Sequence, residues 1–396
     1  MADYSAIRPG TDLSQHARDL LRVHHAVISG GRAPHRPRAL VERSWSRALG
    51  FGLDADTNNR RDPMAFPDVE RRRRESPLST VIADLIRVLA GVADASHFLM
   101  VVTDADGVVL WREGAPAVRR KADGLGFTEG VFWTEATVGT NAIGTALVEA
   151  APVQLFSAEH FEQAQHAWYC TAYPLHDPRT GELLGIVDVS GPALTLHPAI
   201  PALVETAVKL AEAQLWRQHS ARLDRLRRSA EHVVAAAPGP LLIVDDHGWV
   251  AQHAGVATRD RIGAPRDGTA LAVPGMGLCL PERLAEGWIV RPAGPRHGIR
   301  ATLDLTGAPR LEVRGEGASW VVPLTRRHAG ILALLHRAGP DGLSAGRLSR
   351  ALYGDDQHVV TVRAEISRLR RSIGALVSTH PYRVADGVTL EVVADG

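Results

Sequence analysis

The sequence predicts an α+β multidomain protein: an antiparallel sheet with helices, a long connecting helix, a small β-rich middle domain and a C-terminal winged helix. The 396 residues exceed the usual size of one domain, so two to four are expected. Apolar runs at 98–111 and 168–190 are bounded by turn residues, as paired strands are, whereas 198–236 has helical spacing. The predicted boundaries are 1–75, 76–197, 198–236, 237–300 and 301–396.

Composition indicates a soluble globular chain, with 45% apolar and 22% charged residues and a net charge of +1. Contact with nucleic acid would therefore depend on locally clustered charge. Cys170 and Cys279 are the only cysteines and provide no disulfide framework, which favours a reducing, cytoplasmic environment. The sequence shows no basic-apolar leader and no run of about 18 apolar residues, so secretion and a membrane span are not expected.

The N-terminal segment, 1–75, is polar and rich in arginine. Helical spacing predicts helices over 12–27 and 40–49, the second with Trp45 as its apolar anchor. Arg71–Arg74 is a basic run that could contact phosphates, but a solvated helix face is the favoured interpretation.

The segment 76–197 is predicted to contain the antiparallel sheet. Ser79 is expected to cap a helix that ends near Ala90. A strand over 98–103, an Asp-Gly turn and a strand over 108–111 follow, and two longer strands are expected at 168–176 and 183–190. A short helix is expected to begin at 159–161. This order predicts an antiparallel sheet that helices cover on one face.

A glycine-containing stretch, Phe132–Leu147, places an aromatic pair before a Gly-Thr-Asn turn and a helix of small residues. We expect a cup for a small molecule, since such pockets are mostly apolar with a few polar groups. Asn141 has an alternative role as a helix cap. Strand residues alternate between the two faces of a sheet, so only the residues of one face can line the pocket. The candidate ligand residues are Phe132, Trp133, Asn141, Trp168, Cys170 and Tyr173.

His160, Cys170, His176 and Asp188 are the candidates for metal or haem ligands. These residues lack ligand-type spacing, so core or surface roles are favoured and no metal or cofactor is expected. Cys170 on an apolar strand is more typical of an inert thiol than of a redox sensor. No Gly-x-Ser-x-Gly elbow and no Gly-x-Gly-x-x-Gly turn opening a helix is present, so we do not expect an enzyme.

The helical segment 198–236 carries apolar residues at three- and four-residue spacings. Pairing with a second copy in a homodimer is favoured over packing on the sensor sheet. Pro238-Gly239-Pro240 marks the next boundary. The β-rich segment beyond it fits either a degenerate sensor or a docking platform, and its residues select no chemistry.

The C-terminal segment predicts helices over 325–337, from Ser344 to Leu352, and over 358–373, followed by a hairpin over 382–390. The third helix has one apolar stripe and one arginine-rich face, the pattern of a helix that reads a major groove. The alternative is an exposed amphipathic helix. The predicted DNA-binding residues are Thr361, Arg363, Ser367, Arg368, Arg370, Arg371 and Arg383.

Two resemblances extend these predictions. Ser44-Trp45-Ser46-Arg47, Gly139–Leu147 and Cys170-Thr171-Ala172 resemble the GAF sensor region of acetoin-catabolism-type activators, over about 40–215. That resemblance implies a small effector, with acetoin or another short-chain carbonyl or alcohol as the first candidate. The family's ATPase output is not expected, because no Gly-x-x-x-x-Gly-Lys-[Ser/Thr] loop is present.

The second resemblance is that of Val362–Arg371 to the recognition helix of OmpR/PhoB-type DNA-binding domains. No receiver domain precedes it, so control by phosphorylation is not implied. The sequence therefore predicts a ligand-responsive, DNA-binding transcriptional regulator. Its expected partners are double-stranded DNA, the effector, a second copy of the chain and RNA polymerase. The alternative hypothesis is an iron, haem or redox sensor that signals through protein partners.

Overall fold

The computed structural model describes residues 4–57, 59, 61–96, 98–257, 260–292, 299–315 and 318–394. The chain forms two compact units, Met1–Gln218 and His219–Gly396. Helix α8 (Ile200–Ala235) contributes its first half to the first unit and its second half to the second. In the described part of the chain, no helix is both long enough and apolar enough to cross a membrane.

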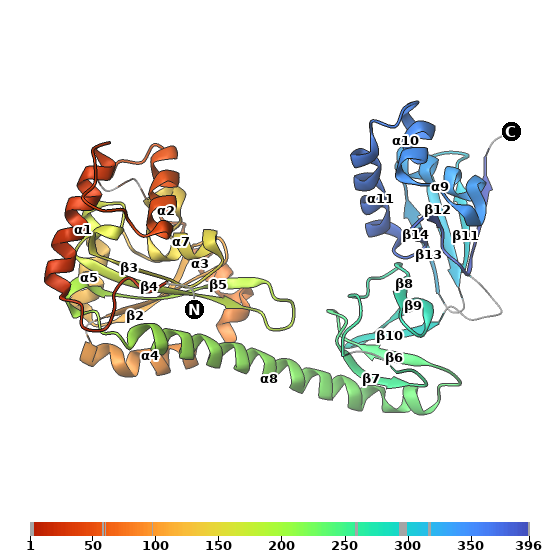
Figure 1. Cartoon of the computed structure of the whole chain (residues 1–396). Coiled ribbons are helices and arrows are strands. Elements are labelled where there is room, and N and C mark those ends of the chain that lie inside the picture. The colour runs from red at the N-terminus through yellow and green to blue at the C-terminus, as the bar shows by residue number, and fades with distance from the viewer. Residues whose placement is uncertain are drawn as a thin grey trace. The chain divides into compact units, whose positions relative to one another are not determined.

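An antiparallel sheet lies at the centre of the first unit (Figure 1). Among the described residues it has five strands in the order β2-β1-β5-β4-β3. The two predicted hairpins are confirmed, because β1 pairs with β2 and β4 pairs with β5. The strands are β1 (Leu99–Thr103), β2 (Val109–Gly114), β3 (Val153–Phe156), β4 (Trp168–His176) and β5 (Leu183–Pro192).

Helices cover both faces of this sheet, so the prediction of one covered face is wrong. Tyr169 and Tyr173 of β4 pack with α4 (Ile82–Ser96) and α8, whereas Trp168 and Ala172 pack in a second core on the other face. The near-continuous apolar run of β4 is the pattern of a strand buried on both faces. The helices of the second face are α2 (Ala39–Gly50), α5 (Pro116–Gly124), α6 (Glu135–Val138) and α7 (Ala142–Glu149).

Three helix starts can be compared with the sequence. Asp12 caps α1 (Leu13–Ile28) by accepting the backbone N–H of Gln15. The predicted cap Ser79 is wrong: Ser76 caps a 3-10 turn, Pro77–Thr80, and α4 begins at Ile82. The helix expected to begin at 159–161 is also wrong. Two 3-10 turns, Ser157–Glu159 and Gln163–Gln165, occupy this region instead. Short polar residues near one another compete for such caps, and spacing alone does not choose between them.

A second antiparallel sheet opens the second unit, with the order β7-β6-β10-β9-β8 among the described residues. Leu226 and Ala230 of α8 pack against Leu241 and Ile243 of β6. The strands are β6 (Leu241–Val244), β7 (Val250–Ala254), β8 (Leu271–Val273), β9 (Gly277–Leu284) and β10 (Gly287–Pro292).

The C-terminal domain joins three helices to a mixed sheet, ordered β13-β12-β11-β16 in the described part. Thr325 and Ser344 cap α9 and α10 as predicted. The elements are β11 (Ile299–Asp304), β12 (Arg310–Gly315), β13 (Ala318–Pro323), α9 (Arg326–Ala338), α10 (Ala345–Tyr353), α11 (Val359–Ile373), β14 (Val377–Thr379), β15 (Tyr382–Val384) and β16 (Val388–Val393).

The hairpin expected over 382–390 is wrong in its second strand. Residues 388–393 form β16, which runs parallel to β11 in the four-stranded sheet. The hairpin is instead made by β14 and β15. The alternation that predicted a strand is present at β16, where Leu390 is buried, but the partner is a strand about 90 residues away in sequence.

Most of the apolar stripe of α8 is covered within the chain, in both halves of the helix. Ala207 packs on the first sheet and Leu226 on the second, whereas Leu210 is 50% exposed. The first half of α8 therefore packs on the first sheet, which was the less favoured of the two interpretations. A homodimer stays a prediction.

Candidate functional site

A polar cluster lies within the apolar face of the first sheet that α2 and α7 cover. Register brings it together, because Cys170 of β4 pairs with Ser190 of β5. The Cys170 Sγ lies 3.2 Å from Nε2 of His160 and accepts a 3.0 Å hydrogen bond from the Ser190 hydroxyl, which also contacts the Asp188 carboxyl group. Core residues such as Phe161 and Ala172 share this face. We call His160, Cys170, Asp188 and Ser190 the cup cluster.

Burial sets the charge state of the cup cluster. It raises the pKa of Asp188 to about 7 and lowers the pKa of His160 to about 4. It also raises the pKa of the Cys170 thiol, so the His160–Cys170 pair is neutral and the thiol is not an activated nucleophile. The Asp188 carboxyl group is buried, and its hydrogen-bond donors within the chain are the Ser190 hydroxyl and the backbone N–H of Thr171. An acceptor of this kind suits a ligand that donates a hydroxyl hydrogen bond.

Three of the four candidate metal ligands, His160, Cys170 and Asp188, lie in this cluster, and His176 does not. His176 is at the far end of β4, where its backbone N–H donates to Glu212. Among the described residues, no group of three or more His, Cys, Asp or Glu side chains has an arrangement that could hold a metal ion.

The predicted ligand residues do not share one face. Trp168 and Cys170 lie on the α2 and α7 side, where Trp133 belongs to the same core. Tyr173 lies on the opposite side and donates a 2.6 Å hydrogen bond to the hydroxyl of Tyr4. The three strand residues of the set therefore divide between the two cores, as strand alternation requires.

Two other members of that set, Asn141 and Trp133, make contacts that stabilise the local structure. Asn141 accepts the N–H of Gly144 at 2.8 Å and donates to the carbonyl of Gly139 at 2.9 Å, so it caps α7. The ring of Trp133 stacks on Phe127 with 4.2 Å between centroids. Phe132 is 36% exposed.

Glu135 is a central residue of this stretch that the sequence analysis missed. Its carboxylate is 2% exposed and accepts from Arg47 Nε at 2.5 Å, from the Ser44 hydroxyl at 2.5 Å and from the Thr145 hydroxyl at 2.8 Å. The signal that could have found it is a lone carboxylate in a stretch of small and apolar residues. The network joins α2, α6 and α7.

Three arginines of the basic run in α3 (Phe66–Glu75), Arg71, Arg72 and Arg73, form ion pairs inside the chain. Arg72 lies 2.5 Å from Asp104 and 2.8 Å from Asp106, and Arg71 lies 2.8 Å from Asp68. These contacts support the interpretation of a solvated helix face over a phosphate patch.

Helix α11 has the two faces that the sequence predicted. Val362, Ile366, Leu369 and Ile373 are buried. The predicted DNA-contacting residues of this helix are all exposed: Thr361, Arg363, Ser367, Arg368, Arg370 and Arg371.

The arginines differ in whether they have a partner. Arg368 pairs with Glu365 at 2.7 Å, and Arg383 of β15 pairs with Asp386. Arg363, Arg370 and Arg371 make no ion pair with any residue that the structure describes. These three guanidinium groups are therefore available to an external anion.

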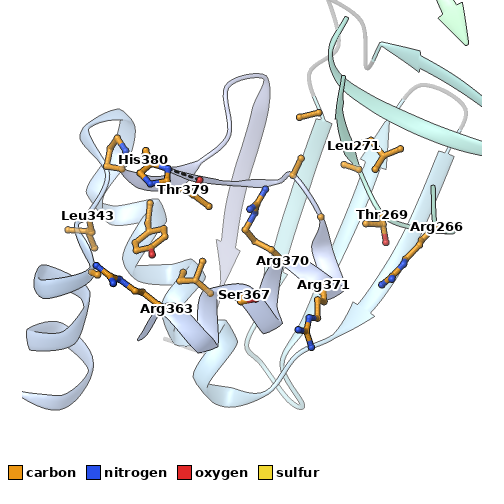
Figure 2. A pocket seen from close by; sticks show the side chains of 18 of the residues that line it. Arg266, Thr269, Leu271, Leu343, Arg363, Ser367, Arg370, Arg371, Thr379 and His380 are labelled. Atoms are coloured by element: carbon orange, nitrogen blue, oxygen red, sulfur yellow. Dashed lines mark hydrogen bonds between the residues drawn. The ribbon is translucent and has the colours of Figure 1, made fainter. Parts of the chain in front are cut away.

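A hollow of about 1010 Å³ lies beside α11 (Figure 2). One wall is α11 itself, with Arg363, Ser367, Arg370 and Arg371. The others are the start of α10, the turn between β14 and β15, and the segment 264–272 that leads into β8. The described lining contains four arginines and His380 but no Asp or Glu. Arg266, the fourth arginine, was not a predicted site residue, and no local pattern in the sequence marks it.

The comparisons with known proteins indicate a transcription regulator with a sensor domain. Residues 17–213 match the family described as MimR, N-terminal domain. The chain is 33% identical over 181 residues to the acetoin dehydrogenase operon activator AcoR of Bacillus subtilis, covering 46% of this chain and 30% of AcoR. It is 27% identical over 199 residues to the propane 2-monooxygenase operon activator MimR of Mycolicibacterium smegmatis, covering 50% of this chain and 33% of MimR. The chain thus spans about a third of the length of these activators, which are regulators rather than enzymes.

One relative matches along nearly the whole chain. An uncharacterised 47.3 kDa protein of the thcA 5′ region in Rhodococcus erythropolis is 30% identical over 395 residues, 98% of this chain and 74% of that protein. The chain belongs to the family of this Rhodococcus protein, and the N-terminal unit is a sensor domain of the kind found in activators of catabolic operons.

Proposed function

We propose that this chain is a one-component transcriptional regulator, in which a GAF-type domain senses a small metabolite and a C-terminal winged helix binds operator DNA. The observation that carries the proposal is the face of α11, where Arg363, Arg370 and Arg371 are exposed and have no carboxylate partner among the described residues. Arginine supplies both bidentate contacts to guanine and contacts to phosphate.

In this proposal α11 lies in the major groove. Arg363, Ser367 and Arg370 reach base edges or the adjoining phosphates, while Arg368 and Arg371 flank the groove. Arg383 is on the β14–β15 hairpin, which contacts the neighbouring backbone as a wing. The chain acts as a homodimer, and RNA polymerase is a partner of the DNA complex.

The effector binds on the cup side of the first sheet. Trp168 and the core around it provide apolar contacts, and Asp188 and Cys170 provide polar ones. A buried carboxyl group beside a thiol and a hydroxyl favours a short-chain alcohol or hydroxyketone, which agrees with the acetoin-related name of one relative. Helix α8 packs on the opposite face of the same sheet and continues into the second unit.

The test is a mobility-shift assay with duplex fragments from upstream of the chain's own gene. Arg363→Ala combined with Arg370→Ala should reduce binding at least about 30-fold, since each good base or phosphate contact contributes about 1–3 kcal/mol. Arg310→Ala is the matched control, because this arginine is 61% exposed and pairs with Asp304 on the sheet away from α11. Equal binding by the double variant and the control would refute the assignment of α11.

A further inference from the structure

The middle domain places an arginine beside the proposed DNA-reading helix. We propose that the segment 264–272 is a second DNA-contacting element, with Arg266 binding a backbone phosphate next to the groove that α11 occupies. This inference rests on the proposed function. It assigns a role to a domain whose sequence indicated no chemistry.

The segment is fixed to the end of α11 through its backbone. Ala270 forms a parallel β-bridge with Gly374, and the N–H of Ala375 donates to the carbonyl of Ala270 at 3.0 Å. Gly374 has φ +65°, and a Cβ atom there would lie 2.2 Å from the Ala270 carbonyl oxygen. Such an approach is open to glycine alone. Arg266 is therefore held by a fixed backbone close to the last turn of α11.

Packing strengthens this attachment. Ala270 is 1% exposed and belongs to the same core as Ile366, Leu369 and Ile373 of α11. Gly268 lies against Trp320, where an added Cβ would be 2.9 Å from the indole ring. The segment is thus part of the surface that α11 presents, and the two elements would meet DNA together.

The charge of the hollow identifies its partner. Arg266, Arg363, Arg370 and Arg371 all line it, and guanidinium groups stay protonated in proteins. The described lining offers them no carboxylate; Asp267 follows Arg266 in sequence but is not part of the lining. Figure 2 shows the side chains of Arg266 and Arg371 on two different elements that border the hollow. Four unneutralised cations on a concave surface suit a polyanion.

Duplex DNA fits this arrangement better than a single small anion. A helix in the major groove is bordered on each side by a row of phosphates, and the groove is about 12 Å wide. Cations that flank the end of a recognition helix meet those phosphates. Contacts of this kind set position and affinity, but they carry no sequence information.

The experiment compares full-length Arg266→Ala, Arg266→Lys and Arg291→Ala in DNA binding at several salt concentrations. Arg291 is the matched control, an arginine of β10 in the same domain that is 44% exposed and outside the hollow. Loss of one phosphate contact should weaken binding roughly 3- to 10-fold near 0.1 M salt and lower the slope of log K against log salt by about 0.9. The effect should be the same on operator and unrelated duplexes, and lysine should restore most of it.

The outcomes separate the two proposals. If Arg266→Ala keeps the wild-type affinity and salt slope while Arg363→Ala loses binding, the inference about the middle domain is wrong and α11 remains the DNA contact. If inorganic phosphate at constant ionic strength raises the melting temperature of the wild type but not of Arg266→Ala, and the salt slopes agree, the hollow binds a free anion instead. A wild-type chain that binds no duplex overturns both proposals.

Discussion

Replacing Glu135 by alanine tests whether the Phe132–Leu147 stretch is a structural element. The side chain is 2% exposed and receives hydrogen bonds from Arg47, Ser44 and Thr145. The substitution would leave the Arg47 guanidinium, 29% exposed, without this partner and would remove an acceptor from two buried hydroxyl groups. Because α2, α6 and α7 meet at this carboxylate, the first unit should lose stability as a whole.

The expected cost follows from burial. Breaking a buried ion pair by removing one partner costs about 3–5 kcal/mol, and the partial exposure of Arg47 places this pair near the lower limit. Each hydroxyl that loses its acceptor adds about 1 kcal/mol. A total of about 5 kcal/mol corresponds to a melting temperature lower by roughly 10–20 °C for a domain of this size.

The assay is thermal unfolding of the full chain, followed by tryptophan fluorescence, with Asp19→Ala as the control. Asp19 pairs with Arg22 on the surface, where the side chains are 36% and 66% exposed, so its loss should change the melting temperature little. If Glu135→Ala has the same melting temperature as Asp19→Ala but no longer responds to the effector, the network is part of the ligand site and the structural reasoning is refuted.

Three further predictions concern the same unit. Asn141→Ala should cost about 1–2 kcal/mol through loss of the α7 cap, seen in urea unfolding, and should leave effector affinity unchanged. Gly144→Ala should prevent folding, because the added Cβ would lie 2.5 Å from a backbone nitrogen, whereas Gly346→Ala has open space; equal yields of folded protein would contradict this. Burial raises the pKa of Asp188 to about 7, so the folded state holds a proton that the unfolded state releases above about pH 4, and stability should fall as pH rises from about 4 to 7. Asp188→Asn should remove that fall, measured as melting temperatures between pH 4 and pH 8; identical pH profiles in both proteins would argue against it.

Elements defined by neighbouring residues were predicted well. The caps Thr325 and Ser344 and the buried stripe of α11 depend on spacings within one helix, and the β4–β5 hairpin depends on a turn of adjacent residues. The partner of β16 could not be predicted, since nothing near residue 388 identifies a strand about 90 residues earlier as its neighbour. The second covered face of the first sheet was missed for a related reason: an apolar run on a strand shows that it is buried, but not by which helices.

The candidate sites divide in the same way. The arginine face of α11 follows from helical periodicity, so the sequence alone places Arg363 and Arg370 on one surface. Arg266 joins them only through the backbone bridge between Ala270 and Gly374, which no local pattern encodes. His160, Cys170 and Asp188 likewise come together through strand register and show no ligand-type spacing along the chain.

The two faces of the first sheet indicate how sensing would reach α8 in the proposed function. Cys170 and Asp188 are on the cup side, whereas Tyr169 and Tyr173 are on the side where α8 packs through Val204 and other core residues. Successive residues of a strand point to opposite faces, so a shift of β4 on the cup side moves the α8 side by the same amount. A close-packed core transmits such a shift because it has few voids to absorb it. The sheet can therefore pass a ligand's effect to α8 through one strand, without any contact between the ligand and the helix.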